Sequence, residues 1–229
     1  MDRPLAPALQ PPPAGDHVSH HVLPHVLPDG LAALLRARQT VLPKRLGAPG
    51  PDAAQLQSIL AAAAHAPDHG CLLPWRFVLV PQDARPALGD VFVQALCERD
   101  AAATPEQQAQ AREKAFRAPV LLLVVVDELS GDGIVPPAER IFSAGCAVQN
   151  LLLMATAQGF GSALTSGKAL QSQALRALFG LQGGERALCF ISLGTVLSRK
   201  PARVRPLPAQ YLGTLVPGRG VQPWHMQEE

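Results

Sequence analysis

Two histidines four residues apart, His65 and His69, stand where a predicted helix gives way to a loop. Pro67 lies between them and disfavours helical geometry in the residue before it, so the pair does not share one helical face. The spacing therefore disfavours a zinc pair, and we expect no metal site here. A helix C-terminal cap with a second, exposed histidine is the plain alternative. A side chain on such a loop can also point into a cleft, where ligand sites are common.

Cys71 follows His69 closely and raises the alternative of a cysteine hydrolase. That chemistry needs a carboxylate to orient the histidine and donors to hold an oxyanion. Only Asp68 offers a nearby carboxylate, and no oxyanion loop can be identified in the sequence. The residues therefore disfavour a hydrolase.

A second polar group, Arg38-Gln39-Thr40, closes the first predicted helix shortly before Lys44 and Arg45. A guanidinium, an amide and a hydroxyl together suit a phosphate monoester. A basic helix end favoured by the helix dipole is the alternative. Taken alone, the segment favours the basic helix end.

The surrounding residues predict the elements that position these groups. Asp29 can cap a helix from Leu31 to about Gln39, and Asp52 with Gln55 forms a capping box for a helix that must end at Ala66. Thr104 caps a helix that ends before Pro119. Further helices are expected over about 84–99, 138–158 and 173–179, and strands over 77–80, 120–126, 160–164 and 187–196. We predict an α+β fold around a mostly buried sheet.

Gly159-Phe160-Gly161 resembles part of a dinucleotide-binding fingerprint, but a helix precedes it where the fingerprint requires a strand. We interpret Gly159 as a left-handed helix C-cap instead. No Walker A sequence and no nucleophile elbow occurs in the sequence.

The bulk composition excludes several classes of function. A net charge of +2 and 4% aromatic residues argue against a nucleic-acid surface. The longest apolar helix candidate is interrupted by polar residues, so we expect no membrane span. The four cysteines form no C-x-x-C pair, which is typical of a reducing, cytoplasmic compartment. We expect residues 1–28 to be a Pro- and His-rich tail whose histidines bind no metal (His17, His20, His21, His25).

The order of several motifs resembles the FMN-dependent nitroreductase family, and within it the compact branch of NAD(P)H nitroreductases. The resemblance rests on Arg38-Gln39-Thr40, on Ala66-Pro67-Asp68-His69 and on Pro74-Trp75-Arg76-Phe77. It continues through Ser143–Ala147, Ala157–Gly161, Ser166-Gly167 and Leu193–Thr195, and it covers about residues 29–200, with 201–229 as a C-terminal extension.

This resemblance implies a nitroreductase-like α+β fold with a mostly antiparallel central sheet. It also implies a homodimer with FMN at the subunit interface and NAD(P)H as electron donor. The implied cofactor-binding residues fall into five groups: Arg38, Gln39 and Thr40; His65 and His69; Met154, Ala155, Thr156, Ala157, Gln158 and Gly159 for the nicotinamide nucleotide; Leu164, Thr165 and Ser166; and Lys200, with Arg199 as an equal candidate.

Three positions depart from the family pattern. Gln39 stands where a second arginine is usual, His65 replaces an arginine, and Leu164-Thr165 replaces a Trp-Arg pair. The changes remove fixed positive charge and an aromatic wall, and contact through His65 becomes shorter and pH-dependent. We therefore predict an altered flavin pocket.

The function implied is ping-pong transfer of hydride from NAD(P)H through flavin N5 to an electron-poor acceptor such as a nitroaromatic or a quinone. No catalytic acid or base is assigned, since the chemistry belongs to the flavin. The substrate lid is expected around residues 82–116. Relatives with other acceptors (enone or semialdehyde reductases, dehalogenases, flavin-fragmenting enzymes) and a non-catalytic flavin binder remain alternatives.

Overall fold

The computed structural model describes residues 28–130, 133–201 and 203–224. The chain divides into two compact units, residues 1–37 and 38–229. In the first, α1 (Pro28–Ala37) has Asp29 inside its first turn and Arg36 in its last. The predicted helix is thus correct in kind, but it begins before Asp29 and ends before Arg38. The histidines of the N-terminal tail lie outside the described residues.

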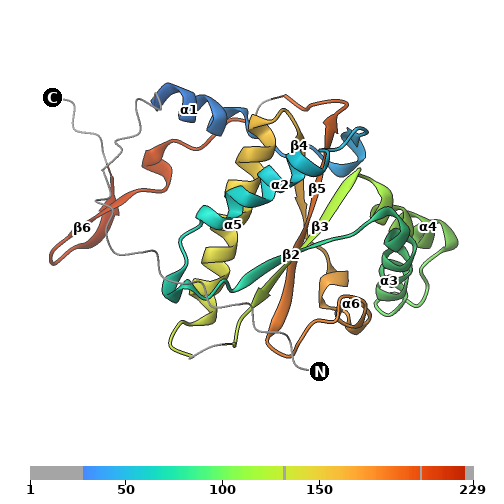
Figure 1. Cartoon of the computed structure of the whole chain (residues 1–229). Coiled ribbons are helices and arrows are strands. Elements are labelled where there is room, and N and C mark those ends of the chain that lie inside the picture. Colours follow the sequence, from blue (N-terminus) through green and yellow to red (C-terminus); the bar gives the residue numbers. More distant parts are fainter. Residues whose placement is uncertain (1–27, 131–132, 202, 225–229) are drawn as a thin grey trace, which may run out of the picture. The chain divides into compact units, whose positions relative to one another are not determined.

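The second unit is built on an antiparallel sheet, and Figure 1 labels its strands β2 to β5. Its strands are β1 (Leu46–Gly47), β2 (Trp75–Leu79), β3 (Val120–Asp127), β4 (Gly161–Thr165) and β5 (Glu185–Val196). The order is β1-β5-β3-β2, and β4 also pairs with β5. All of these pairings are antiparallel, which confirms the predicted α+β class and sheet.

The sheet is buried on both faces because β3 carries apolar side chains at every central position. Successive side chains of a strand point to opposite faces, so β3 contributes to two separate cores. Leu121, Leu123 and Val125 belong to one cluster, whereas Leu122 and Val124 belong to the other. The unbroken valine-rich run thus has the two-sided burial that the sequence predicts.

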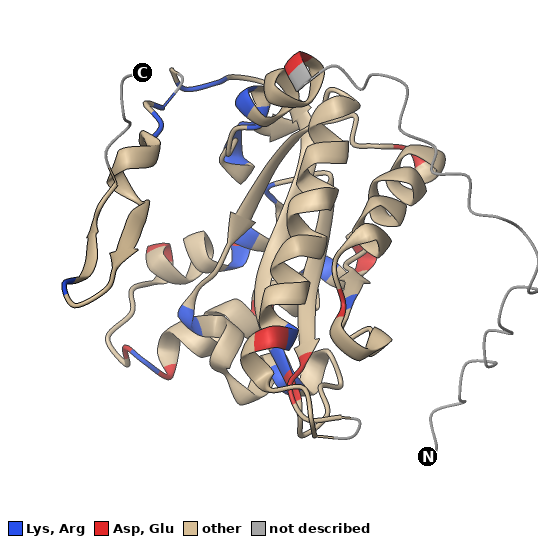
Figure 2. Ribbon diagram, turned by 90° about the vertical axis from the view of Figure 1, so that its left-hand side faces the viewer, with Lys and Arg blue, Asp and Glu red and all other residues tan. Residues whose placement is uncertain are grey.

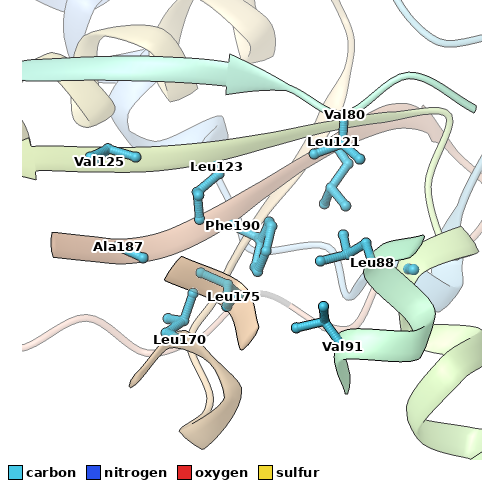
Figure 3. Close-up of a cluster of buried hydrophobic side chains, with 11 residues drawn as sticks. Val80, Leu88, Val91, Leu121, Leu123, Val125, Leu170, Leu175, Ala187 and Phe190 are labelled. Carbon is cyan, nitrogen blue, oxygen red and sulfur yellow. The ribbon is translucent and has the colours of Figure 1, made fainter. Parts of the chain in front are cut away.

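Figure 3 shows the first of these clusters, between the sheet and two helices. Leu88 and Val91 come from α3 (Arg85–Cys97) and Leu175 from α6 (Gln173–Leu178). Phe190 of β5 contacts Phe92 of α3 edge to face, with 5.7 Å between ring centroids. The same side of the molecule holds α4 (Pro105–Glu113), η5 (Lys114–Phe116) and η6 (Lys168–Gln171), which adjoin α3.

The second cluster packs α2 (Ala53–Ala61), η2 (Ala62–His65) and α5 (Pro137–Ala157) on the opposite face. Ile59 of α2 and Leu151 of α5 are fully buried there. Three small residues of α5 lie close together, and two of them, Ala144 and Ala147, are fully buried. They face the chain's own core, so only Gly145 of that set is exposed.

Local signals fix the helix ends as predicted. Asp52 and Thr104 each form a capping box, with Gln55 and Gln107 respectively. Ala66 is extended, at ψ 143°, directly before Pro67. Gly159 ends α5 at φ +85°, a left-handed conformation that side chains disfavour. Helix, glycine and strand therefore follow in that order, so Gly159–Gly161 is not a dinucleotide fingerprint.

The remaining short elements are η1 (Pro43–Arg45), η3 (His69–Cys71), η4 (Gln82–Ala84) and η7 (Pro208–Gln210). Near the C-terminus, β6 (Gly213–Val216) and β7 (Gly220–Pro223) form an antiparallel hairpin. The domain boundaries at residues 28 and 200 stay predictions. Among the helices described, none is long and apolar enough to cross a membrane.

Candidate functional site

Arg38, Gln39 and Thr40 do not close the first helix, contrary to the sequence prediction. They lie after α1, and Thr40 forms a parallel bridge with Ser162 at the start of β4. The Val41 amide donates to the Ser162 carbonyl at 2.8 Å. This pairing requires extended backbone, and a tertiary contact overrides helix propensity at such a position. The segment is thereby fixed beside β4.

Arg205 joins this segment from the far end of the sequence. Its Nη2 donates to the Arg38 carbonyl at 3.1 Å. Burial, and then the nearby Arg205 charge, lower the pKa of Arg38 below its ordinary value. In the described ranges neither arginine has a carboxylate within ion-pair distance. Two guanidinium groups without a counter-charge form a site that favours an anion.

The predicted basic residue after β5, Lys200, is exposed, as is Arg199. The structure gives neither a contact to Arg38, whereas Arg205 has one. Figure 2 shows Lys and Arg in the stretch that leads toward the C-terminal hairpin. The sequence analysis missed Arg205, although the spacing Arg203-x-Arg205 beyond Lys200 already indicated a basic segment.

Leu164, Thr165 and Ser166 stand at the other end of β4 from the Thr40 bridge. Leu164 is exposed, in place of an aromatic wall. Thr165 and Ser166 line a cavity of about 630 Å³ together with Leu42. This volume is in the range of small-molecule sites. The structure thus places two predicted groups, 38–40 and 164–166, along one strand.

Within the same chain, His69 lies elsewhere, at the start of α5. Its Nδ1 is 2.7 Å from Glu139 Oε2, and both side chains are at least half exposed. Glu139 is in the first turn of α5 and is another partner that sequence reasoning missed. The Asp68 carboxylate instead accepts from the Leu73 amide at 2.7 Å. The Asp68 carboxylate therefore stabilises its own loop and does not orient His69.

That loop is conformationally unusual. Gly70, Cys71 and Leu73 all have positive φ, at +74°, +50° and +46°. Non-glycine residues rarely adopt this geometry, and strain of this kind clusters at functional sites. In the part of the chain described, no hydrogen bond joins Cys71 to His69, and no group of three His, Cys, Asp or Glu could hold a metal ion.

The two groups of predicted residues are separated by the length of α5. Gln158, at its C-terminal end, donates from Nε2 to Ser58 Oγ of α2 at 3.0 Å, whereas Glu139 at its first turn meets His69. A helix of 21 residues is about 30 Å long. His65 ends η2, which packs on α5, and is exposed. One chain therefore does not gather His69 and Arg38 around a single ligand.

The stretch Met154–Gly159 covers the last turn of α5 and its cap. Ala155 is fully buried, and the Thr156 hydroxyl donates to the Leu152 carbonyl at 2.8 Å. Ala157 and Gly159 are exposed. The Gln158 Oε1 is buried without a hydrogen-bond partner in the described residues. Contact of this stretch with a nicotinamide nucleotide stays a prediction. Only its exposed residues are accessible for such a contact.

The chain is an α+β protein with an antiparallel sheet between helices, a pair of neighbouring arginines at one end of β4 and a partly apolar cavity at the other. A model of the nitroreductase family matches residues 35–195. The "Putative NAD(P)H nitroreductase" of Haemophilus influenzae is 36% identical over 162 residues, which cover 71% of this chain and 87% of the relative. The chain belongs to the nitroreductase family.

Solved structures have the same fold. A nitroreductase-like family protein from Bacillus cereus matches with a TM-score of 0.69 and 20% identity, over 82% of this chain and 96% of that one. A variant of the FMN and NADPH-dependent nitroreductase NfnB from Sphigopyxis sp. strain HMH matches with a TM-score of 0.64 and 20% identity, over 79% and 96% of the two chains. At these identities, the likeness establishes the fold.

Proposed function

We propose that this protein is an FMN-dependent NAD(P)H oxidoreductase that reduces an electron-poor acceptor such as a nitroaromatic or a quinone. Family membership supports the class, and the relatives named for FMN, NADPH or NAD(P)H support the cofactors. The observation that carries the proposal is the pair Arg38 and Arg205, which lacks a carboxylate partner in the described residues and lies beside β4.

The residues present fit a flavin phosphate. A phosphate monoester carries up to two negative charges, and two guanidinium groups supply bidentate donors for it. Thr40 adds a hydroxyl, and Gln39 adds an amide where a further charge is usual in the family. Arg205 therefore supplies donors for the phosphate. Compared with the usual family pattern, the pocket has one positive charge fewer at Gln39.

The flavin, when bound, would accept hydride from NAD(P)H and pass it to the acceptor, each substrate entering the same pocket in turn. The chain binds and orients; no side chain needs to act as a nucleophile. Thr165 and Ser166 offer hydroxyl donors at the cavity wall, and Leu42 and Leu164 offer apolar contact near the same strand. In this proposal these groups position the flavin ring and exclude water from it. They do not transfer protons.

A homodimer would complete the site. Two copies packed antiparallel along α5 would bring the His69 end of one copy toward the Arg38 end of the other. The free face of α5 supports this arrangement: Phe142 is 69% exposed, and Gly145 and Gln149 follow on the same side. Figure 2 shows that α5 is charged only in its first turn, at Glu139 and Arg140.

The first test is the visible absorption spectrum of the purified protein, followed by anaerobic addition of NADPH and then NADH. Two oxidised-flavin bands that bleach with one nucleotide would support the proposal and identify the donor. Parallel double-reciprocal lines with an acceptor would support ping-pong turnover. A protein that remains colourless after incubation with FMN would contradict the flavin role.

Mixing two variants that each bind FMN weakly tests the shared site. Arg38→Gln and His69→Ala should each weaken FMN binding, while a mixture refolded together should recover about a quarter of the sites, because heterodimers regenerate one intact site each. Recovery would show that the two residues act in trans. Light scattering that finds a monomer, or a mixture that recovers nothing, would contradict a site shared between copies.

A further inference from the structure

The cavity beside Thr165 and Ser166 has an apolar floor. Leu121, Leu170 and Phe190, labelled in Figure 3, belong both to the core cluster and to the cavity lining. Phe92 and Leu96 of α3 add further apolar side chains to the lining. A flat, apolar ring system can lie against such a surface, since aromatic groups contribute large contact areas.

The mouth of this cavity is positively charged. Its basic side chains come from four separate segments: Lys44, Arg99, Lys114 with Arg117, and Lys168. No Asp or Glu is among the described residues that line the cavity. Cations drawn from distant parts of the sequence converge on one opening, which concentrates positive potential there.

Local pairing offsets part of this charge. Arg117 Nη2 donates to Glu113 Oε2 at 2.8 Å, and that hydrogen bond is the main reason why the pKa of Glu113 is lowered. Glu113 lies outside the cavity lining. Among the described residues, Lys44, Lys114 and Lys168 have no ion-pair partner. The Glu113 carboxylate also interacts at longer range with Lys114 and Lys44, which lower its pKa further. Within the described ranges the three lysines are therefore free of ion pairs, but only Lys168 is without this neighbouring negative charge.

We propose that the acceptor reduced by this protein is an anionic aromatic molecule, with its ring on the apolar floor and its carboxylate or similar group at Lys44, Lys114 and Lys168. The inference rests on the proposed function, because it identifies the substrate class of the same site. The flavin phosphate is the other anion that would suit these lysines, but Arg38 and Arg205 already provide for that group, and the test distinguishes the two ligands.

The closing experiment measures binding without turnover. Naphthalene-2-carboxylate and its uncharged counterpart naphthalene-2-carboxamide, neither of them reducible here, are titrated calorimetrically into the purified full-length protein. We expect the carboxylate to bind about tenfold more tightly, since a charge contact of about 1.4 kcal/mol corresponds to that ratio. Raising the salt concentration should reduce the difference.

Lys114→Gln should weaken binding of the carboxylate about fivefold and leave binding of the carboxamide unchanged. The matched control is Arg112→Gln, which removes an exposed charge two residues away that is paired with Asp90 and lies outside the cavity lining. The control should change neither titration. FMN content, measured from absorbance, should be the same in both variants.

A kinetic arm uses 4-nitrobenzoate and its methyl ester. Reduction of the nitro group to nitroso consumes one NAD(P)H and one proton and releases water and NAD(P)⁺. Lys114→Gln should raise KM for the acid alone, with kcat little changed.

Equal binding of the two naphthalene probes to the unaltered protein would overturn the inference, as would equal effects of Lys114→Gln and Arg112→Gln. Loss of FMN from Lys114→Gln with an unchanged probe ratio would also overturn it and assign the lysines to the flavin. A colourless protein that still prefers the carboxylate would instead overturn the proposed function while supporting the anion site.

Discussion

Two sets of arginines in this molecule contrast sharply. Arg85 and Arg140 are each 1% exposed and donate to backbone carbonyls. Arg38 and Arg205 lie together near the surface without a carboxylate in the described part of the chain. The first set has its donors satisfied within the fold, whereas the second leaves donors for a ligand. Side-chain type alone does not distinguish a structural cation from a binding one.

Arg85 illustrates a buried arginine whose guanidinium nitrogens all donate hydrogen bonds within the fold. Its Nε donates to the Val80 carbonyl at 2.8 Å and its Nη1 to the Ala115 carbonyl at 2.6 Å, with weaker contacts to Ala118 and Pro119. These carbonyls belong to the residue after β2, to η5 and to the two residues before β3. Arg85 therefore anchors the segment that carries Lys114 to the sheet.

The largest effect is expected for Arg85→Met, which keeps side-chain bulk but leaves the buried carbonyls unsatisfied. Stability should fall by about 3–4 kcal/mol, since each buried polar group without a partner costs about 1–3 kcal/mol. Urea denaturation followed by circular dichroism measures the change. A loss below about 1 kcal/mol, the typical effect of a single mutation, would contradict the structural role assigned to the buried arginines.

The next effect is expected for Arg38→Gln, where binding rather than stability should change. The Kd for FMN should rise about 30- to 100-fold, because charge-assisted hydrogen bonds to a phosphate are worth about 2–3 kcal/mol. Fluorescence titration of the flavin-free protein measures it. The control is Arg36→Gln in the last turn of α1, which should leave the Kd unchanged.

An intermediate loss of stability is expected where an arginine is paired with a carboxylate. Arg76 donates to Glu185 at 2.7 and 2.9 Å, which holds the pKa of this carboxyl below its usual value. Glu185→Gln should cost about 2 kcal/mol at pH 7, less than for a fully buried pair because Arg76 is partly exposed.

The cost should depend on pH in a definite direction. A carboxyl with a lowered folded-state pKa stabilises above its unfolded value of about 4.3, and the contribution is lost as pH falls through the folded value. The difference between the original protein and Glu185→Gln should therefore shrink below about pH 4. Denaturation midpoints from pH 3 to 7 check this, and a difference that grows in acid would contradict it.

The smallest effect is expected for Arg112→Gln. Its partner Asp90 and Arg112 are both well exposed, and a surface ion pair contributes about 0–1 kcal/mol. Stability should change by less than about 0.5 kcal/mol in the same urea assay. A larger loss would show that surface pairs also anchor α4, and the contrast between buried and exposed arginines would weaken.

Much of the fold could be predicted because its signals are local. Asp52 and Thr104 cap helices with residues three positions away, and Pro67 ends η2 through the residue beside it. The apolar run of β3 needs no distant partner to indicate two-sided burial. The order of the motifs was sufficient to indicate the family.

The sequence by itself determined the family, most of the helices and the four strands β2 to β5, since these depend on neighbours along the chain, whereas the short β1 and the β6–β7 hairpin were not predicted. Only the tertiary structure decided that Thr40 lies against Ser162, that Arg205 reaches Arg38, and that His69 meets Glu139. It also placed Lys44, Lys114 and Lys168 around one cavity. Such contacts join residues tens to more than a hundred positions apart, and they are fixed by how the buried sheet packs against its helices rather than by any local preference.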